Sequence, residues 1–212
     1  MNYQPRYKPI PPIKWAVLTP LYDFFCVMAG FGKMFRRKVL AFGALKDGMM
    51  AVDVGCGTGV FLEVAKERYP NVAFTGIDPD AFALSIARRR LERKDLAVEL
   101  RQAFAEATAL ADGTVDVCFS ILAFHHLPDD VKKRATQEMY RVLKPGGRVV
   151  IADFGKRRPG FFMRLYILFE KQEYIAGNLK GFIPQYLGEA GFRNVAVAGR
   201  HFPAVDIVTG QK

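Results

Sequence analysis

The chain has 212 residues, half hydrophobic and a quarter charged, which excludes an intrinsically disordered protein and suits one domain with a single substantial core. Its three cysteines, Cys26, Cys56 and Cys118, are far apart and form no CxxC pair. This spacing argues against a disulfide framework and a structural zinc site, and it predicts a cytoplasmic location. Lys and Arg (31) outnumber Asp and Glu (21), so the formal net charge is +10.

The basic residues gather in four places along the chain. The clusters are Arg36-Arg37-Lys38, Arg88-Arg89-Arg90 with Arg93-Lys94, Lys132-Lys133-Arg134 and Lys156-Arg157-Arg158. Such clusters attract nucleic acid, anionic lipid headgroups or an acidic substrate. They are also what solvated helix faces look like, and the sequence alone leaves both interpretations open.

The N-terminal region, residues 1–45, is predicted to form an arm and two helices. Residues 1–13 contain four prolines and indicate an extended arm, and helices are predicted at 14–30 and 33–45. The stretch 15–31 is apolar, but a proline and an aspartate interrupt it. We therefore expect neither a transmembrane span nor a signal peptide there.

Between residues 46 and 155, short apolar runs alternate with longer amphipathic segments. Strands are predicted at 49–54, 72–77, 97–101, 115–120 and 148–153, and helices at 58–69, 81–93 and 129–143. The last helix is expected to end at Lys144-Pro145-Gly146-Gly147, since glycine adopts positive φ and proline cannot continue a helix. Strands that are apolar on both faces predict a parallel sheet covered by helices, an α/β doubly wound fold with its ligand beyond the carboxyl ends of the strands.

The last part of the chain, residues 156–212, has a different pattern. The run 159–169 is almost wholly apolar, and a helix is predicted at 182–190. Two strands, at 194–198 and 204–209, are separated by only a few residues, which predicts an antiparallel hairpin that closes the chain. We interpret the whole of 1–212 as one domain, with 46–155 as its ligand-binding core.

A glycine-rich loop lies between the first predicted strand and its helix. Its sequence is Val52-Asp53-Val54-Gly55-Cys56-Gly57-Thr58-Gly59. Glycine permits a tight turn and a close approach of backbone to a ligand, and the following helix N-terminus offers amides to an anion. A dinucleotide fingerprint requires GxGxxG, whereas this loop is GxGxG because Val60 occupies the third glycine position of that pattern.

The second predicted strand ends at Gly76-Ile77-Asp78-Pro79, beside the loop. A carboxylate at the tip of this strand accepts hydrogen bonds from the two ribose hydroxyls of an adenosine. The alternative for Asp78 is an N-cap of the next helix, ahead of Pro79.

Together with Arg141-Val142-Leu143-Lys144-Pro145-Gly146-Gly147-Arg148, these two segments resemble successive motifs of the class I S-adenosylmethionine-dependent methyltransferases. Within them the chain looks most like the group of the ubiquinone/menaquinone C-methyltransferases. The resemblance covers residues from about 20 to about 155 well and the tail only in outline. It implies a Rossmann-like, three-layer α/β/α fold with N-terminal helices, whose seven-stranded sheet has its last strand antiparallel.

The resemblance also implies residues that bind S-adenosyl-L-methionine and its product, S-adenosyl-L-homocysteine. Asp53 and the loop residues Gly55, Cys56, Gly57, Thr58 and Gly59 are expected at the methionine end, Asp78 at the ribose and Pro79 along the adenine. Tyr22, Ser120 and Ile121 match further positions that line the cofactor site in relatives. Cys56 itself is expected to be a small filler of the loop rather than a nucleophile.

The adenine end of the site departs from the family. Relatives carry Asp or Asn followed by Ala after the third strand, whereas this chain has Phe104 followed by Ala105. Phe104 cannot accept a hydrogen bond from the adenine amino group, so recognition would rest on stacking and on the amide of Ala105.

Methyl transfer needs a base only if the acceptor must lose a proton. His125 and His126 follow the fourth strand and Asp153 ends the fifth, on the predicted cofactor side, and all three are candidates without an assigned role. Adjacent histidines in a loop are expected to point in different directions, and His201 is the only other histidine, so no metal site is predicted.

The sequence thus favours a methyltransferase for a small, hydrophobic acceptor such as a quinone precursor or a lipid-like molecule. The apolar run 159–169 suggests a lid or a membrane-facing rim, or else a buried or dimer-interface helix, and the basic clusters suggest contact with an anionic membrane. The chain lacks the motifs of nucleic-acid amino-group or cytosine methyltransferases after the fourth strand, which argues against that acceptor. Methylation of RNA or protein is the alternative, and a non-catalytic binding module is the second one. The oligomeric state is left open.

Overall fold

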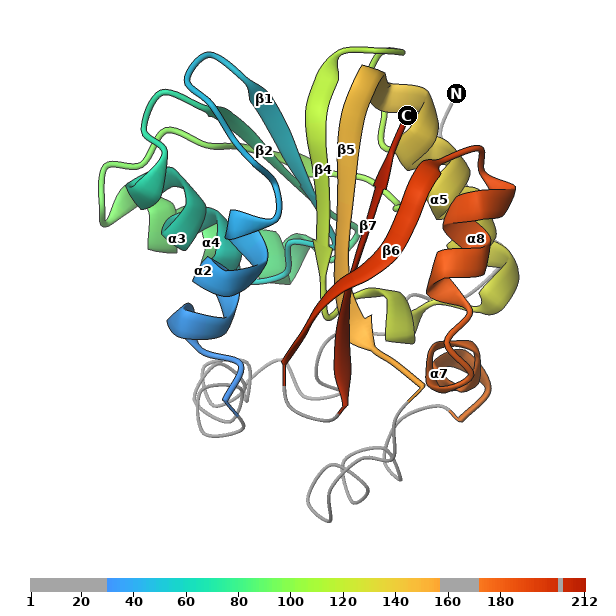
Figure 1. Ribbon diagram of the computed structural model, residues 1–212. Coiled ribbons are helices and arrows are strands. Elements are labelled where there is room, and N and C mark those ends of the chain that lie inside the picture. Colours follow the sequence, from blue (N-terminus) through green and yellow to red (C-terminus); the bar gives the residue numbers. More distant parts are fainter. Residues whose placement is uncertain (1–29, 157–171, 202–203) are drawn as a thin grey trace.

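The computed structural model describes residues 30–156, 172–201 and 204–212, and a seven-stranded sheet runs through its centre (Figure 1). In spatial order the strands are β3 (Glu99–Gln102), β2 (Ala73–Asp78), β1 (Met50–Val54), β4 (Val115–Ile121), β5 (Leu143–Phe154), β7 (Val205–Gln211) and β6 (Arg193–His201). β1 to β5 pair in parallel, whereas β7 is antiparallel to both β5 and β6. The predicted doubly wound fold and the antiparallel closing hairpin are therefore confirmed.

Helices cover both faces of this sheet. One face carries α2 (Lys33–Ala41), α3 (Val60–Arg68) and α4 (Ala81–Glu92), and the other carries α5 (Asp129–Val142) and α8 (Ile183–Glu189) (Figure 1). α7 (Gln172–Leu179) and the short 3-10 helix η2 (Phe124–His126) contact each other near the end of β5. Within the described ranges, no helix is both long and apolar enough to cross a membrane.

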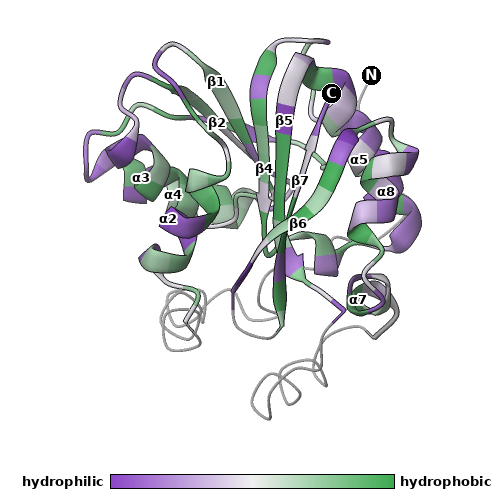
Figure 2. Cartoon of the chain, in the orientation of Figure 1, coloured by the Kyte–Doolittle hydropathy of each residue, from purple (hydrophilic) through white to green (hydrophobic). Residues whose placement is uncertain are grey.

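The core is divided into two layers because successive strand residues face opposite sides. Ala51 packs with Leu62 of α3 on one face, while its neighbour Val52 packs with Met139 of α5 on the other. Figure 2 shows the hydrophobic colour concentrated along β4 and β5 at the centre of the sheet. Strands buried on both faces explain why the sequence shows apolar runs rather than alternation.

The helix predicted at 129–143 ends at Val142, directly before the predicted terminator at 144–147 as expected, but the terminator residues themselves belong to the next strand. α5 ends at Val142 and β5 begins at Leu143, so Pro145 and Gly146 are part of the fifth strand and not of a turn before it. The β4–β5 register jumps there, from Leu143 opposite Val115 to Arg148 opposite Val117. Gly146 takes φ +78° and its amide donates to the Lys212 carbonyl, so the C-terminal residue pairs with this irregularity.

The N-terminal elements are described only in part. The helix expected at 33–45 is α2 and is shorter, ending at Ala41. The predicted arm at 1–13, the helix at 14–30 and the apolar run 159–169 lie outside the described residues.

The order of the strands reverses between β1 and β4, whose carboxyl ends lie at one edge of the sheet. The chain runs outward from β1 through β2 to β3 and then returns to the other side of β1 to form β4, so this is where the order of the sheet reverses. In such sheets ligands bind outside the carboxyl ends at the reversal. The glycine loop after β1 and the residues after β2, β4 and β5 meet at this edge, the lower one in Figure 1.

Candidate active site

The glycine loop combines tight packing with one open position. Gly55, Gly57 and Gly59 all have positive φ, between +51° and +80°. A Cβ atom at Gly55 would lie 2.4 Å from Cβ of Ala123, and one at Gly59 would lie 2.9 Å from Cβ of Ala87. A Cβ atom at Gly57 would have nothing within 4 Å. Gly55 and Gly59 therefore let the loop approach its neighbours, and Gly57 borders free space.

Asp78 at the end of β2 is held against this loop. Its Oδ2 accepts from the Gly57 amide at 2.8 Å, and its Oδ1 accepts from the Asp80 amide at 2.9 Å. Burial, opposed by these two hydrogen bonds, raises the pKa of Asp78 to about 6. Each carboxylate oxygen keeps a second lone pair for a further donor.

The alternative role of Asp78 as a helix cap is wrong. The N-cap of α4 is Asp80, whose Oδ1 accepts from the amides of Phe82 and Ala83 at 2.8 and 3.3 Å. Asp80 lies one residue beyond Pro79, so the proline precedes the cap instead of following it.

Asp53 is a buried carboxyl group in β1, directly before the glycine loop. Its Oδ1 has no hydrogen-bond partner among the described residues. Burial raises the pKa of Asp53 to about 8, although the charge of Arg36 lowers it, and the nearby charge of Asp78 adds to the rise. A buried carboxyl with an unsatisfied oxygen is a site for a cation that the protein itself does not supply.

The N-terminus of α3 gives the loop an electropositive end. Gly59 is the N-cap and has no side chain to accept from the first amides of the helix. These amides carry the positive end of the helix dipole and suit a carboxylate or another anion.

Cys56 and Ser120, in and beside the glycine loop, contribute to the packing of the protein. A Cβ atom at Gly76 would lie 2.9 Å from Sγ of Cys56, and burial raises the pKa of the Cys56 thiol well above its usual range. Such a thiol stays protonated, in agreement with a small filler of the loop. Ser120 is buried and its hydroxyl donates to the Val54 carbonyl at 2.8 Å, so it joins the ends of β4 and β1.

The predicted adenine segment follows β3. Gln102 is the register partner of Asp78, and Phe104 and Ala105, both half-buried, come directly after it. The Gln102 amide donates to the Pro79 carbonyl at 3.1 Å. This places the segment beside the tip of β2. Tyr22 lies outside the described residues.

A buried polar network joins the ends of β4 and β5 to α7. Nδ1 of His125 lies 2.9 Å from Oδ1 of Asp153, and the His125 amide donates to Oδ2 at 3.3 Å. The side chain of Asn178 donates to the same Oδ1 at 3.1 Å. The sequence indicated His125 and Asp153 separately, but not that they pair, and it carried no signal for Asn178.

The two histidines do not point apart. The His125 and His126 rings have centroids 4.0 Å apart at 44°, and His126 is half-buried beside its fully buried neighbour. The expectation of divergent side chains is therefore wrong, because the two neighbouring rings lie against each other. Elsewhere, Nε2 of His201 lies 2.9 Å from the Gly30 carbonyl, and the described residues contain no group of three metal-ligating side chains.

The comparisons with known proteins agree with this geometry. Residues 51–147 match a family model described as a methyltransferase domain. A ubiquinone/menaquinone biosynthesis C-methyltransferase from Geobacter sulfurreducens is 28% identical, over 92% of this chain and 85% of that protein. A demethylmenaquinone methyltransferase from Thermus thermophilus is 30% identical, over 77% of this chain and 76% of that protein.

The chain belongs to the class I S-adenosylmethionine-dependent methyltransferases. A solved S-adenosylmethionine-dependent methyltransferase from Aquifex aeolicus is 25% identical and has a TM-score of 0.66, with 83% of this methyltransferase and 88% of that chain covered. The methyltransferase is thus an enzyme, which removes the hypothesis of a non-catalytic module.

The groups around the glycine loop fit S-adenosylmethionine in charge and shape. The orphaned Oδ1 of Asp53 suits a cationic group, and the spare lone pairs of Asp78 suit hydroxyl donors. The first amides of α3 suit a carboxylate, and the free space at Gly57 leaves room for the molecule to pass.

Proposed function

We propose that this methyltransferase transfers the methyl group to a small, hydrophobic, hydroxylated aromatic acceptor, a quinone precursor in its reduced form. The main support for this proposal is the large share of the chain that aligns with a quinone-biosynthesis methyltransferase. The Geobacter relative aligns with 92% of the chain, whereas the methyltransferase-domain match covers only residues 51–147. The similarity therefore extends beyond the methyltransferase-domain match and includes most of the residues on either side of it. Both relatives named above act in quinone biosynthesis by their names.

The cofactor residues follow from the same site. In our proposal Asp53 binds the amino group of the methionine end, the first turn of α3 binds its carboxylate, and Asp78 binds the ribose hydroxyls. Phe104 and Ala105 lie against the adenine. Bound in this way, S-adenosylmethionine supplies a methyl group on a positively charged sulfur, and the protein positions the acceptor and excludes water.

The acceptor side of the site is apolar apart from the buried polar network. Phe154 at the end of β5 meets the His125 ring edge-on, and Phe124 of η2 and Ile175 of α7 are buried on two elements that contact each other. Such surroundings favour an aromatic acceptor over a charged one.

Methylation of RNA through the basic surface has less support. The cluster at 132–134 is on α5, on the opposite face of the sheet from the clusters of α2 and α4. Its three cations are paired, Lys132 with Asp129, Lys133 with Glu189 and Arg134 with Asp130. The described basic clusters therefore do not line one groove.

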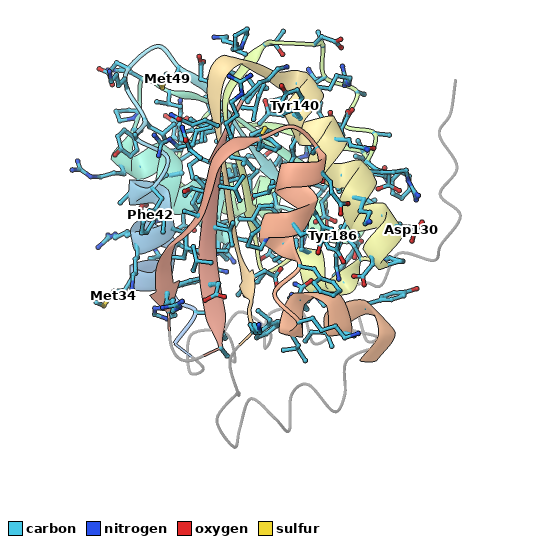
Figure 3. The ribbon with its side chains drawn as sticks, turned by 45° about the vertical axis from the view of Figure 1, so that its right-hand side comes forward. Met34, Phe42, Met49, Asp130, Tyr140 and Tyr186 are labelled. Carbon is cyan, nitrogen blue, oxygen red and sulfur yellow. The ribbon has the colours of Figure 1, made fainter. Side chains whose placement is uncertain are left out.

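We further propose that one face of the protein contacts an anionic membrane, where an acceptor with an apolar tail resides. We call the exposed residues Arg37, Arg88, Arg89, Met34 and Phe82 the basic face. Its three arginines have no carboxylate partner among the described residues. Met34 is 84% exposed and projects away from α2, and Phe82 is 46% exposed (Figure 3). Arginines beside exposed apolar side chains suit an anionic lipid surface.

The acceptor is tested with a demethylmenaquinone that carries one isoprene unit. The protein is incubated with S-adenosylmethionine labelled in its methyl group and with the reduced or the oxidised form of this acceptor. We expect one labelled methyl group on a ring carbon of the reduced form and none on the oxidised form, detected by mass spectrometry. Asp78→Ala, which loses the proposed ribose contact, is the inactive control. Transfer to added RNA but not to the hydroquinone would contradict the proposal.

A further inference from the structure

His125 is more tightly held than a loop residue needs to be. Its backbone amide and its ring Nδ1 both contact the carboxyl group of Asp153, at 3.3 and 2.9 Å. Asp153 in turn accepts from the Phe154 amide at 2.7 Å and from Asn178 at 3.1 Å. The imidazole is thus fixed from β5 and α7 at once, in addition to its own 3-10 turn.

The other ring nitrogen is left available. Nε2 of His125 is buried and has no hydrogen-bond partner among the described residues. A carboxylate only accepts hydrogen bonds, so the proton of the neutral imidazole lies on Nδ1 and the lone pair lies on Nε2. A buried lone pair without a donor is unfavourable unless a ligand supplies the donor.

The charged surroundings of this imidazole keep Asp153 ionised. Burial by itself raises the pKa of Asp153, but the hydrogen bond of His125 and the charge that its protonated form carries outweigh burial and hold the pKa below its usual range, with a smaller contribution from His126. The buried cation Lys132 of α5 also interacts with the charge of Asp153, and it is paired with Asp129. Asn178 of α7 is neutral.

The network lies at the reacting edge of the sheet. η2 follows β4 directly, and Ala123, just before η2, closes on Gly55 of the glycine loop. On its other side the His125 ring meets the Phe154 ring edge-on, with centroids 4.8 Å apart. His125 therefore stands between the glycine loop and the apolar end of β5.

We propose that His125 is the general base of the reaction, with Nε2 accepting the hydroxyl proton of the aromatic acceptor and with Asp153 and Asn178 as positioning residues. The inference rests on the proposed function. Loss of this proton releases electron density to the ring, whose carbon bonds to the methyl carbon while the sulfur–methyl electron pair stays on sulfur. The ring carbon then loses its own proton and the oxygen regains one, so one proton in total passes to solvent.

The matched variants are His125→Asn and His126→Asn. In the first, the side-chain amide of the new asparagine keeps a donor at the place of Nδ1 for Asp153 but has no group at the place of Nε2. With the reduced one-isoprene demethylmenaquinone, we expect His125→Asn to lower kcat by about 10²- to 10⁴-fold, the usual share of a general base. Its affinity for S-adenosylhomocysteine, measured by calorimetry, is expected to stay unchanged. We also expect the wild-type rate to rise with pH, and we expect no such rise in His125→Asn.

A merely structural role would give a different result. Wild-type turnover in His125→Asn, or loss of turnover in His126→Asn alone, would overturn the inference. So would a variant whose remaining rate keeps the wild-type pH profile, because the titrating group would then lie elsewhere.

A second measurement keeps the inference separate from the identity of the acceptor. Nitrogen-15 NMR of the histidine rings, in the complex with S-adenosylhomocysteine, reports which nitrogen of His125 carries the proton. We expect Nδ1 protonated and Nε2 bare, with a shift at Nε2 when 1,4-naphthohydroquinone is added. If the wild type methylates no hydroquinone, the proposed function fails. A protonated Nε2, or no shift at Nε2 when 1,4-naphthohydroquinone is added, overturns the role of His125 itself.

Discussion

At the scale of single residues, Asp53 shows a conflict between stability and binding. The protein buries its carboxyl group and leaves Oδ1 without a partner among the described residues. The pKa of about 8 means that the group is largely protonated at neutral pH. Its contribution to stability is then fully present below the unfolded pKa and is lost as pH rises through about 8. A cationic ligand reverses this preference for the protonated form, because its positive charge favours the ionised carboxylate of Asp53.

The first prediction concerns proton release at Asp53. Binding of S-adenosylhomocysteine near pH 7 should release a proton from Asp53, and its affinity should increase as pH rises towards 8. Calorimetry in buffers of different ionisation enthalpy measures the released proton. Asp53→Asn is expected to bind more weakly, without that proton, and to lose less stability than the wild type between pH 6 and 9. Equal proton release by the variant and the wild type would contradict the assignment.

At the scale of elements, one buried carboxylate ties three helices together. Glu63 of α3 pairs with Lys33 of α2 at 2.6 Å, and with Arg90 and Lys94 of α4 and its C-terminal end at 3.2 and 2.9 Å. Burial alone would raise the pKa of Glu63, but the hydrogen bonds from these three cations lower it to about 2. This stabilisation is present above the ordinary pKa of glutamate and is lost as pH falls towards 2.

Glu63→Gln should therefore destabilise the α2–α3–α4 face. We expect the free energy of unfolding to fall by about 1–3 kcal/mol, the range for hydrogen bonds to charged groups. Glu67→Gln on the same helix is the matched control, because Glu67 is exposed and pairs only with Lys94 among the described residues, and about 0–1 kcal/mol is expected there. Urea denaturation at pH 7 measures both. Equal losses in the two variants would show that the buried carboxylate has no special role.

At the scale of the whole molecule, the positive charge is divided between two faces of different character. On α5 the cations of residues 132–134 are paired with carboxylates. On the opposite face, Glu63 links α2 and α4, and these two helices carry the arginines of the basic face together with exposed Met34 and Phe82. Of these two faces, within the part of the chain that the structure describes, only the basic face has arginines without carboxylate partners that could bind an external partner.

The protein should accordingly bind anionic vesicles through the basic face. Co-sedimentation is expected with phosphatidylglycerol vesicles at low salt, and not with phosphatidylcholine vesicles. The triple variant Arg37→Gln, Arg88→Gln, Arg89→Gln should lose about 1 kcal/mol of binding per arginine. The matched double variant Lys133→Gln, Arg134→Gln on α5 should bind as the wild type does. Equal losses from both faces would indicate non-specific attraction by net charge.

Much of the fold and of the donor site could be read from local pattern. Apolar runs of strand length, helical periodicity and glycine at positive φ are properties of short segments, so the strands β1 to β5, the loop at Gly55 and the place of Asp78 follow from neighbouring residues. For the same reason the Pro145-Gly146 pair was expected in a turn after the helix, although it lies within β5. It carries the local signature of a terminator, but pairing with the C-terminal residue retains it within β5.

The tertiary structure decided which of these residues act on one another. His125 and Asp153 are 28 residues apart in the chain and Asn178 is 25 residues further on, yet they share one hydrogen-bond network. The unsatisfied oxygen of Asp53 and the cation cluster around Glu63 depend in the same way on burial and on strand order. The sequence by itself predicted the fold class, because short-range pattern reveals strands and helices, and it predicted the methyl donor through the resemblance of its motifs to those of methyltransferases. The buried charges and the imidazole beside the acceptor edge required the folded sheet, since only long-range packing brings their partners together and excludes water from them.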